Sequence, residues 1–285
     1  MDNDDELALT FQRTRAGLLA ARAGDLAFLA VPARRGGFSV ASAHGLPNPP
    51  EEWQAAQFWA IHRAVADEDA FRIHVSELAE HRRDVARLDR RETAAGASTP
   101  WGVAQLSRVY APGIVRHATA GHGGFGIHPE QNALVPAPYR NDGGWYEEDI
   151  EWAKVAAAFP DLFTSYERAC ADRTLRDAEP DAYEAVNGIV LEPGASHTKD
   201  ARRFAREHAQ DWIVISAINS RRHPGLVECV ATRGGERRPG SEERRFLVDA
   251  AIYGVGPFGF VIDEDRDRPF EGPSSFVGGG CSSTA

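Results

Sequence analysis

A single histidine stands among glycines in the segment TAGHGG, residues 119–124, directly after a run typical of a β-strand. Glycine lets the backbone approach a neighbouring group closely or take a positive φ angle. An imidazole held in such a turn can serve as a general base or bind a ligand. We therefore predict that His122 is a catalytic base. The alternative is a tight turn in which this histidine is only structural.

Acidic residues follow a short distance downstream, in GWYEEDIEWA. Residues 145–159 have the spacing of an amphipathic helix, with Glu148 and Asp149 at the edges of a tryptophan-bearing stripe. Acids in a first helical turn gain roughly 0.3–1 kcal/mol from free amide groups. Burying an unpaired carboxylate costs several kcal/mol, so each of these two acids needs a partner. We expect Glu148 or Asp149 to orient His122 or to act as the acid.

The surroundings of His122 supply further binding candidates. Alternation along the strand-like run 114–120 places His117 and Thr119 on one face. Tryptophans nearby offer aromatic surface, and the glycines allow close approach. The predicted binding residues are His117, Thr119, Gly123, Gly124, Trp101 and Trp145.

A metal site at the same place finds little support in the spacing. The donor atoms would come from His117, His122, Glu148 and Asp149, with His128 nearby. An HxxxxH pattern across a strand and a turn is not a standard metal spacing, and the chain has no HExxH motif. We therefore predict no metal ligands, and the sequence identifies no cofactor.

Helices between pairs of strands must position these groups. Two β-rich runs around Arg34-Arg35-Gly36-Gly37 predict a hairpin, and Pro112-Gly113 predicts a second turn. Helices are expected over 6–22, 51–88 (two), 145–159, 165–176, 181–186 and 199–210, with a short one opening at His128-Pro129. Strands are expected over 26–31, 38–43, 103–110, 114–120, 212–218, 226–233, 245–253 and 258–263. Because βαβ units are scarce, the pattern favours an α+β fold of antiparallel hairpins packed with several helices.

The small polar segment 89–99 lacks periodicity and predicts a boundary. We expect an N-terminal helical and hairpin region over 1–95 and a core domain over 98–188. A β-rich region over 189–272 is expected to pack on that core, followed by a flexible tail over 273–285.

Composition excludes several classes of protein. With 285 residues, 42% of them hydrophobic, the chain is not a disordered protein. No apolar run is long enough to span a bilayer, and the acidic start MDNDDELALTFQ is unlike a secretory signal, which predicts a cytoplasmic protein without membrane contact.

The charge and the cysteines narrow the range further. A net charge of −10 argues against nucleic acid as the main ligand, although five arginines leave local contact as a smaller alternative: Arg233, Arg237, Arg238, Arg244 and Arg245. Cys170, Cys229 and Cys281 form no CxxC pair, so a zinc ribbon is not supported, and a catalytic thiol remains a minor alternative.

Five segments together resemble an uncharacterised bacterial family, a domain of unknown function. They are TPWGVAQ, YAPGI, TAGHGGFGI, GWYEEDIEWA and TLRDAEPDAYEA, all between residues 98 and 188. Proteins of this family are often encoded on plasmids, phages and integrated elements. The resemblance implies an accessory role on mobile DNA but no catalytic mechanism.

Two classes of function follow from these observations. One is a hydrolase or transferase that uses a His–carboxylate site. The other is a non-catalytic acidic protein that binds a host or plasmid protein through exposed aromatic residues, for counter-defence or plasmid maintenance. The partner is not identified by the sequence.

Overall fold

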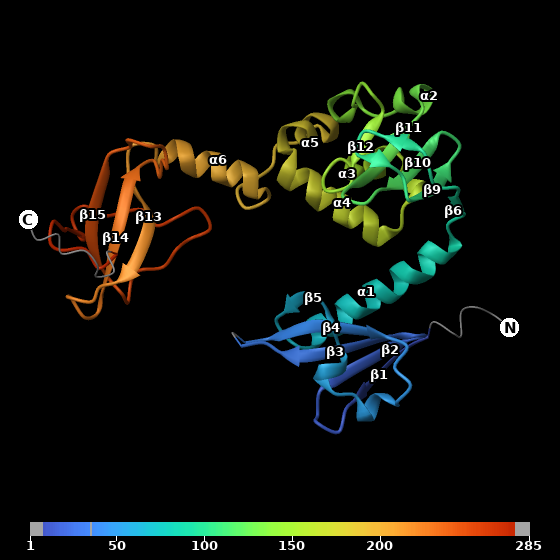
Figure 1. Ribbon diagram of the computed structural model, residues 1–285, viewed down its shortest axis with the longest axis horizontal. Coiled ribbons are helices and arrows are strands. Elements are labelled where there is room, and N and C mark those ends of the chain that lie inside the picture. Colours follow the sequence, from blue (N-terminus) through green and yellow to red (C-terminus); the bar gives the residue numbers. More distant parts are fainter. Residues whose placement is uncertain (1–7, 35, 277–285) are drawn as a thin grey trace, which may run out of the picture. The chain divides into compact units, whose positions relative to one another are not determined.

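The structure is a computed structural model that describes residues 8–34 and 36–276 (Figure 1). The chain divides into two compact units, Met1–Ile189 and Val190–Ala285. Helices and antiparallel sheets make up both, so the predicted α+β class is confirmed. Cys281 and most of the expected tail lie outside the described residues. Within them, no helix combines the length and the apolar composition needed to cross a membrane.

The first unit opens with a five-stranded antiparallel meander whose strands follow one another in space. They are β1 (Leu9–Arg13), β2 (Leu19–Ala23), β3 (Leu26–Pro32), β4 (Phe38–His44) and β5 (Ala60–Val65). Helix α1 (Glu68–Arg87) packs Phe71 and Val75 against the sheet, and Asp67 caps the helix by accepting the Ala70 N–H. The predicted hairpin over residues 26–43 is confirmed as β3 and β4.

Two predictions for this region were wrong. The helix expected over 6–22 is not formed by its described residues, 8–22, because Leu19, Ala20 and Ala21 are all buried in β2 between two partner strands. Continuous burial of a central strand removes the alternation by which a strand is recognised. Residues 51–88 contain one α-helix rather than two, preceded by short 3-10 turns (Pro50–Glu52, Ala55–Gln57) and β5.

A second five-stranded antiparallel sheet holds the residues predicted to do chemistry. Its strands, in spatial order, are β12 (Trp145–Glu147), β11 (Gly123–Ile127), β10 (Ile114–Ala118), β9 (Leu106–Ala111) and β6 (Arg91–Thr93). A small hairpin, β7 (Ser98–Thr99) and β8 (Gly102–Val103), precedes β9. The turn predicted at Pro112-Gly113 joins β9 to β10.

Helices cover one face of this sheet (Figure 1). They are α2 (Pro129–Asn132), α3 (Trp152–Ala158), α4 (Ser165–Ala178) and α5 (Pro180–Asn187), with 3-10 turns at Ala137–Tyr139 and Pro160–Leu162. Phe125 and Tyr146 from the sheet meet Val155, Phe163 and Leu175 in the core. The helices predicted at 165–176 and 181–186 correspond to α4 and α5.

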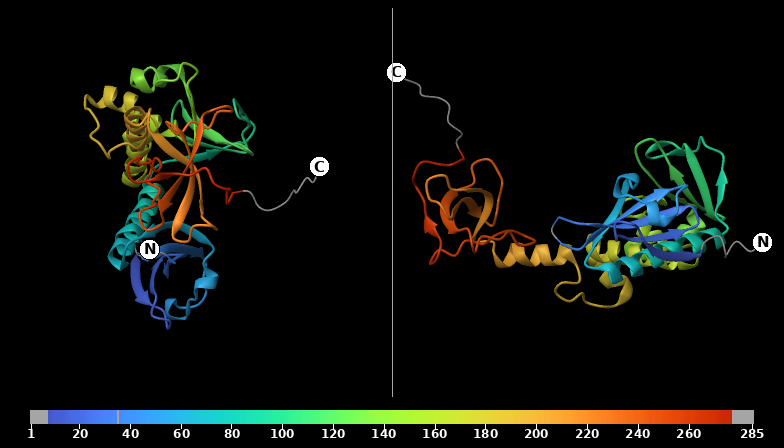
Figure 2. Two further views of the ribbon diagram at one scale, coloured as in Figure 1. Left: turned by 90° about the vertical axis from the view of Figure 1, so that its left-hand side faces the viewer. Right: turned by 90° about the horizontal axis from the view of Figure 1, so that it is seen from below.

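The second unit contains α6 (His197–Glu207) and an antiparallel sheet. The sheet runs β13 (Trp212–Asn219), β14 (Leu226–Arg233), β15 (Glu243–Asp249), β16 (Arg268–Pro269). Figure 2 shows that these strands curl. The buried core of the unit includes Trp212, Cys229 and Phe246. The strand expected over 258–263 is reduced to two isolated bridges, Val261 with Ile213 and Gly259 with Gly256.

Candidate functional site

The register of the second sheet decides which side chains share a face. Ser107, His117, Gly124 and Glu147 are cross-strand neighbours in one row across β9, β10, β11 and β12. The adjacent row, with Arg116, points to the opposite, helix-covered face. Glu147 therefore lies on the same face as His117, at the end of the sheet where the β10–β11 turn begins.

Close backbone packing explains the glycines that flank His122. A Cβ atom on Gly123 would lie 2.6 Å from Glu148 Oε2 and 2.6 Å from the His117 carbonyl oxygen. One on Gly124 would lie 2.1 Å from the Tyr146 carbonyl oxygen. These glycines allow β12 and the first carboxylate after it to approach the hairpin, which fixes acidic groups beside His122.

Three titratable side chains meet at this end of the sheet: His122, Glu147 and Glu148, hereafter the His–carboxylate cluster. One ligand atom from each lies within 4.8 Å of the other two. The closest pair is His122 Nδ1 and Glu147 Oε1, at 3.6 Å. His122 is 63% exposed, whereas the side chains of Glu147 and Glu148 are 26% and 32% exposed. The cluster is thus open to solvent on the histidine side.

Glu147 is held firmly at one oxygen and left without a partner at the other. Its Oε2 accepts the Asp149 N–H at 2.7 Å, and its own backbone N–H donates to Glu151. Its Oε1 is shielded from solvent and has no hydrogen-bond partner among residues 8–34 and 36–276. A shielded carboxylate oxygen without a donor is costly, so this atom is poised to receive a proton or a cation.

Glu148 faces a different neighbour, Arg116, whose Nη2 lies 3.6 Å from Glu148 Oε2. Both residues line a pocket of about 230 Å³. The other lining residues are mostly aromatic: Tyr110, Phe125, Trp152, Phe163 and Glu167. Glu148 is therefore shared between the His–carboxylate cluster and a pocket with an aromatic wall.

The remaining predicted binding residues have structural roles. His117 is buried, is hydrogen-bonded through Nδ1 to Ser107 Oγ at 2.8 Å, and burial lowers the pKa of its imidazole. Thr119 closes the turn, because its hydroxyl donates to the His122 carbonyl oxygen at 2.6 Å. Trp101 packs edge-on against Trp145, and its ring lies over Gly124. These residues shape the sheet end rather than meet at the cluster.

The helix predicted over 145–159 is wrong in its first half. Residues 145–147 form strand β12, a turn follows, and α3 begins only at Trp152. Asp149 is exposed and its carboxylate lies outside the cluster, while Glu147, which the helix would have turned to water, is inside. The strand pairs with β11, and that long-range pairing outweighs the local helical pattern.

A buried lysine contacts two carboxylates beside this turn. Lys154 is buried, and its Nζ lies 3.4 Å from Glu151 and 2.6 Å from Glu179. Burial alone would raise the pKa of the Glu151 carboxyl, but hydrogen bonds from Glu147 N–H and Asn141, with Lys154 nearby, lower it overall. These contacts anchor the β12–α3 turn beneath the cluster.

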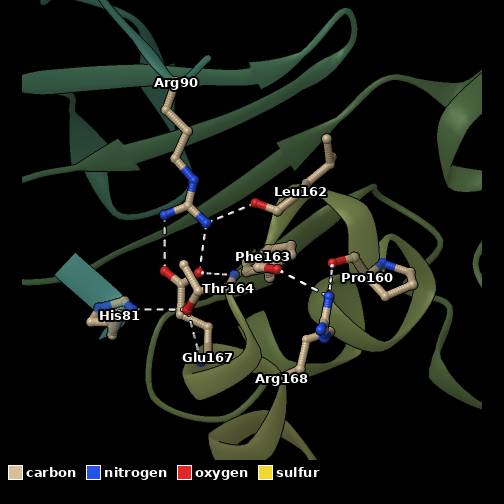
Figure 3. Close-up of polar contacts among 8 residues, drawn as sticks. All are labelled: His81, Arg90, Pro160, Leu162, Phe163, Thr164, Glu167 and Arg168. Carbon is tan, nitrogen blue, oxygen red and sulfur yellow. Dashed lines mark hydrogen bonds and ion pairs between the residues drawn. The ribbon is translucent and has the colours of Figure 1, made fainter. Parts of the chain in front are cut away.

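Glu167, which lines this pocket, belongs to a hydrogen-bonded group shown in Figure 3. The group comprises His81, Arg90, Thr164 and Glu167 and is called the junction network below. Arg90 donates to both carboxylate oxygens of Glu167, at 2.9 and 2.6 Å, and to the Leu162 carbonyl oxygen at 2.7 Å. Its guanidinium also lies 4.2 Å from the centre of the Tyr110 ring. The network ties the segment after α1 to the start of α4.

Capping of α4 depends on the same residues. Thr164 accepts the Glu167 N–H while Glu167 accepts the Thr164 N–H, which is a capping box. His81 on α1 is hydrogen-bonded to the Thr164 hydroxyl at 2.8 Å. Burial alone would raise the pKa of the Glu167 carboxyl, but the bonds from Arg90 and Thr164 outweigh it and lower that pKa.

The arginines considered for nucleic-acid contact all have partners inside the second unit. Arg233 and Arg244 lie over the Trp212 ring, and Arg237 donates to the Ile215 carbonyl oxygen. Arg238 pairs with Glu236, and Arg245 pairs with the buried Glu228. This arrangement leaves little unpaired positive charge in the group.

The segment that contains the cluster also matches a protein-family model. Residues 94–209 match the model of a family described as a domain of unknown function, DUF7007. The match covers less than half of the 285 residues. Within the matched residues lie the β7–β8 hairpin, strands β9 to β12 of the second sheet, all three side chains of the cluster and α2 to α6. Comparisons with curated proteins and with solved structures gave no match.

Sequence reasoning missed Glu147 in this DUF7007 segment. The signal that could have found it is Gly143-Gly144 followed by Trp-Tyr, because glycines before two aromatic residues are typical of a strand start. In a strand over 145–147 the side chains of Glu147 and Tyr146 point to opposite faces of the sheet, whereas in a helix they do not. Whether residues 145–147 are assigned to a helix or to a strand therefore determines which acid is expected beside His122.

Proposed function

We propose that this protein is a hydrolase or transferase whose reacting centre is the His–carboxylate cluster, with substrate bound in the adjoining pocket. The observation that supports it is that His122 lies close to two carboxylates. One of them, Glu147, has a solvent-shielded oxygen that accepts no hydrogen bond from the described residues. The family resemblance further suggests an accessory role on bacterial mobile elements, and we propose a cytoplasmic location for that role.

Proton transfer is the chemistry that these groups can perform. His122 takes the proton of a water molecule or substrate hydroxyl group, and Glu147, 3.6 Å away, stabilises the imidazolium that forms. Glu148 reaches the pocket and, as the acid, gives its own proton to the leaving group; the proton held by His122 then passes through water to restore Glu148. Arg116, beside Glu148, offers a guanidinium to an anionic substrate group.

The test uses the full chain against panels of ester, amide, phosphoester and glycoside substrates over a range of pH. If turnover is found, His122→Gln and Glu148→Gln should each lower it by about 10²–10⁴-fold, the usual contribution of a general acid or base. Asp142→Asn is the matched control, because that exposed carboxylate lies outside the cluster. Asp149→Asn tests the acid that the sequence had offered instead.

Full activity in both cluster variants would show that the reacting centre is elsewhere. The same result in Glu148→Gln alone would leave His122 as the base and remove the proposed acid.

A second candidate is a non-catalytic protein-binding factor, because large apolar side chains are exposed beside an edge strand. Trp59 is 73% exposed and Ile61 on β5 is 72% exposed. Aromatic residues in such positions are typical anchors of protein interfaces. Capture of a host or plasmid protein that Trp59→Ala abolishes and His122→Ala preserves would favour this function.

A further inference from the structure

We propose that the His–carboxylate cluster binds one divalent transition-metal ion, such as Zn²⁺ or Mn²⁺. The ligand atoms are a ring nitrogen of His122 and one oxygen each from Glu147 and Glu148. Imidazole with carboxylate oxygens is a donor set that these ions prefer, whereas Ca²⁺ and Mg²⁺ favour oxygen alone. The inference rests on the location of the proposed active site and concerns how that site activates water.

The distances leave little to change on binding. Zn²⁺ holds nitrogen and oxygen ligands at about 2.0–2.2 Å, so two of its ligand atoms lie at most about 4 Å apart. The three atoms in the cluster already lie within 4.8 Å of one another. His122 is exposed on a turn and can rotate about its side-chain bonds, so a shift of roughly 1 Å closes the site.

A second observation points to a missing cation. Glu147 Oε1 is shielded from solvent, and no donor in the described part of the chain bonds to it. The side-chain nitrogen paired with it, His122 Nδ1, is 3.6 Å away, which is longer than a hydrogen bond. An ion between these two atoms would satisfy the oxygen and use the imidazole as a neutral ligand.

The surroundings suit a ligand rather than a simple ion pair. The other oxygen of Glu147 is fixed by the Asp149 N–H, which orients the carboxylate in the way that outer hydrogen bonds orient metal ligands. Glu148 contacts the Arg116 guanidinium, so the two carboxylates and this cation together carry one net negative charge while the imidazole is neutral. The exposed side of His122 leaves further coordination positions open to water.

A bound ion would change the role of His122 from base to ligand. The ion itself would lower the pKa of a bound water molecule, which supplies a nucleophile at neutral pH. Glu148, on the pocket wall, remains the residue that links the ion to a substrate.

The test is direct metal binding to the full chain, purified without a histidine tag and stripped with a chelator. Titration with Zn²⁺ and Mn²⁺, followed by calorimetry, should show one site per chain, and Co²⁺ should give a visible absorption spectrum. His122→Gln and Glu147→Gln should each weaken metal affinity by about tenfold or more, because changing even the residues that orient a metal ligand typically costs that much. His128→Gln is the matched control, because His128 is exposed and outside the cluster.

The inference is overturned if the intact chain binds neither ion, or if His122→Gln and His128→Gln bind equally well. Circular dichroism checks that each variant is folded, and Glu148→Gln provides an independent variant on the pocket side. Turnover that survives chelation but is lost in His122→Gln would reject the ion and keep the proposed function. Metal binding that depends on His122, in a chain that shows no turnover, would keep the metal site and reject the proposed enzymatic function.

Discussion

Two groups of polar side chains in the first unit can be compared: the His–carboxylate cluster at the end of the β10–β11 hairpin, and the junction network where α1 approaches α4. In the junction network, Arg90 is 6% exposed, and both oxygens of Glu167 receive hydrogen bonds from it at 2.9 and 2.6 Å. In the His–carboxylate cluster, the closest contact is 3.6 Å and one shielded oxygen of Glu147 has no donor in the part of the chain that is described.

The difference separates a structural site from a candidate functional one. In the junction network both carboxylate oxygens of Glu167 accept hydrogen bonds, although the buried Arg90 Nε has no partner among the described residues. These bonds hold the segment after α1 against α4. In the cluster it is a carboxylate oxygen that lacks a donor among the described residues, which stabilises the fold little and leaves capacity for a ligand. The two places border the same pocket through Glu167 and Glu148.

The largest expected effect is at the junction network. Arg90→Ala leaves Glu167 without its buried partner, and removing one member of a buried pair costs about 3–5 kcal/mol. Because Glu167 is 20% exposed, we expect a loss at the lower end of that range, about 3 kcal/mol in the free energy of unfolding. Urea denaturation measures it. Arg91→Ala is the control, because Arg91 is an exposed neighbour paired with Asp89. Equal losses in the two variants would contradict the comparison.

Substituting a glycine that positions the cluster should destabilise the fold more than substituting the cluster's own histidine. Gly124→Ala places a methyl group 2.1 Å from the Tyr146 carbonyl oxygen and against the Trp101 ring, and overpacking of this kind costs roughly 1–3 kcal/mol. Gly121→Ala is the control, because a Cβ there meets nothing within 4 Å. Thermal denaturation of both proteins provides the measurement. An unchanged melting temperature in Gly124→Ala would show that β11 and β12 are not packed as described.

Acid should remove the contribution that the Glu167 carboxylate makes to the stability of the junction network. The pKa of the Glu167 carboxyl is lower in the folded chain than its ordinary value, so its stabilising contribution is complete above the ordinary carboxyl range. The contribution is lost as the pH falls through the lowered folded-state pKa. The difference in unfolding free energy between wild type and Glu167→Gln should therefore shrink as the pH is lowered below about 4.5. A difference that does not vary with pH would show that Glu167 is not ionised in the fold.

The smallest effect on stability is expected at the cluster itself. His122→Ala removes an exposed side chain with one long contact, so the unfolding free energy should change by less than about 0.5 kcal/mol. The same denaturation experiment measures it, with the Arg90→Ala loss for scale. A loss of more than about 2 kcal/mol would mean that His122 is a structural residue and that the comparison fails.

Local turn chemistry and alternation were sufficient for much of the fold. The hairpin of β3 and β4, the turn at Pro112-Gly113 and the start of α2 at Pro129 follow from residues adjacent in the chain. Helices α4 and α5 were predictable for the same reason, since Thr164 and Gly188 mark their ends by capping. The division of the chain into domains at 95, 188 and 272 remains a prediction.

Errors appeared where pairing between distant segments overrides a local pattern. Residues 19–21 and 145–147 each have a helical spacing, yet each is a strand because partners elsewhere in the sequence bury it. Strand stability depends on cross-strand neighbours, which a local window does not contain. Assigning these segments to strands required the partners, not the residues themselves.

The sequence by itself determined that an imidazole would sit in a glycine turn with acidic groups not far along the chain, because residue types and turn chemistry are local properties. Only the tertiary structure decided which acids those are. Pairing of β12 with β11 turned Glu147 toward His122, left Asp149 in solvent, and brought Glu148 to the pocket beside Arg116. A change of three residues from helix to strand rotates each side chain to a new face, and that rotation depends on hydrogen bonds to a strand about twenty residues away.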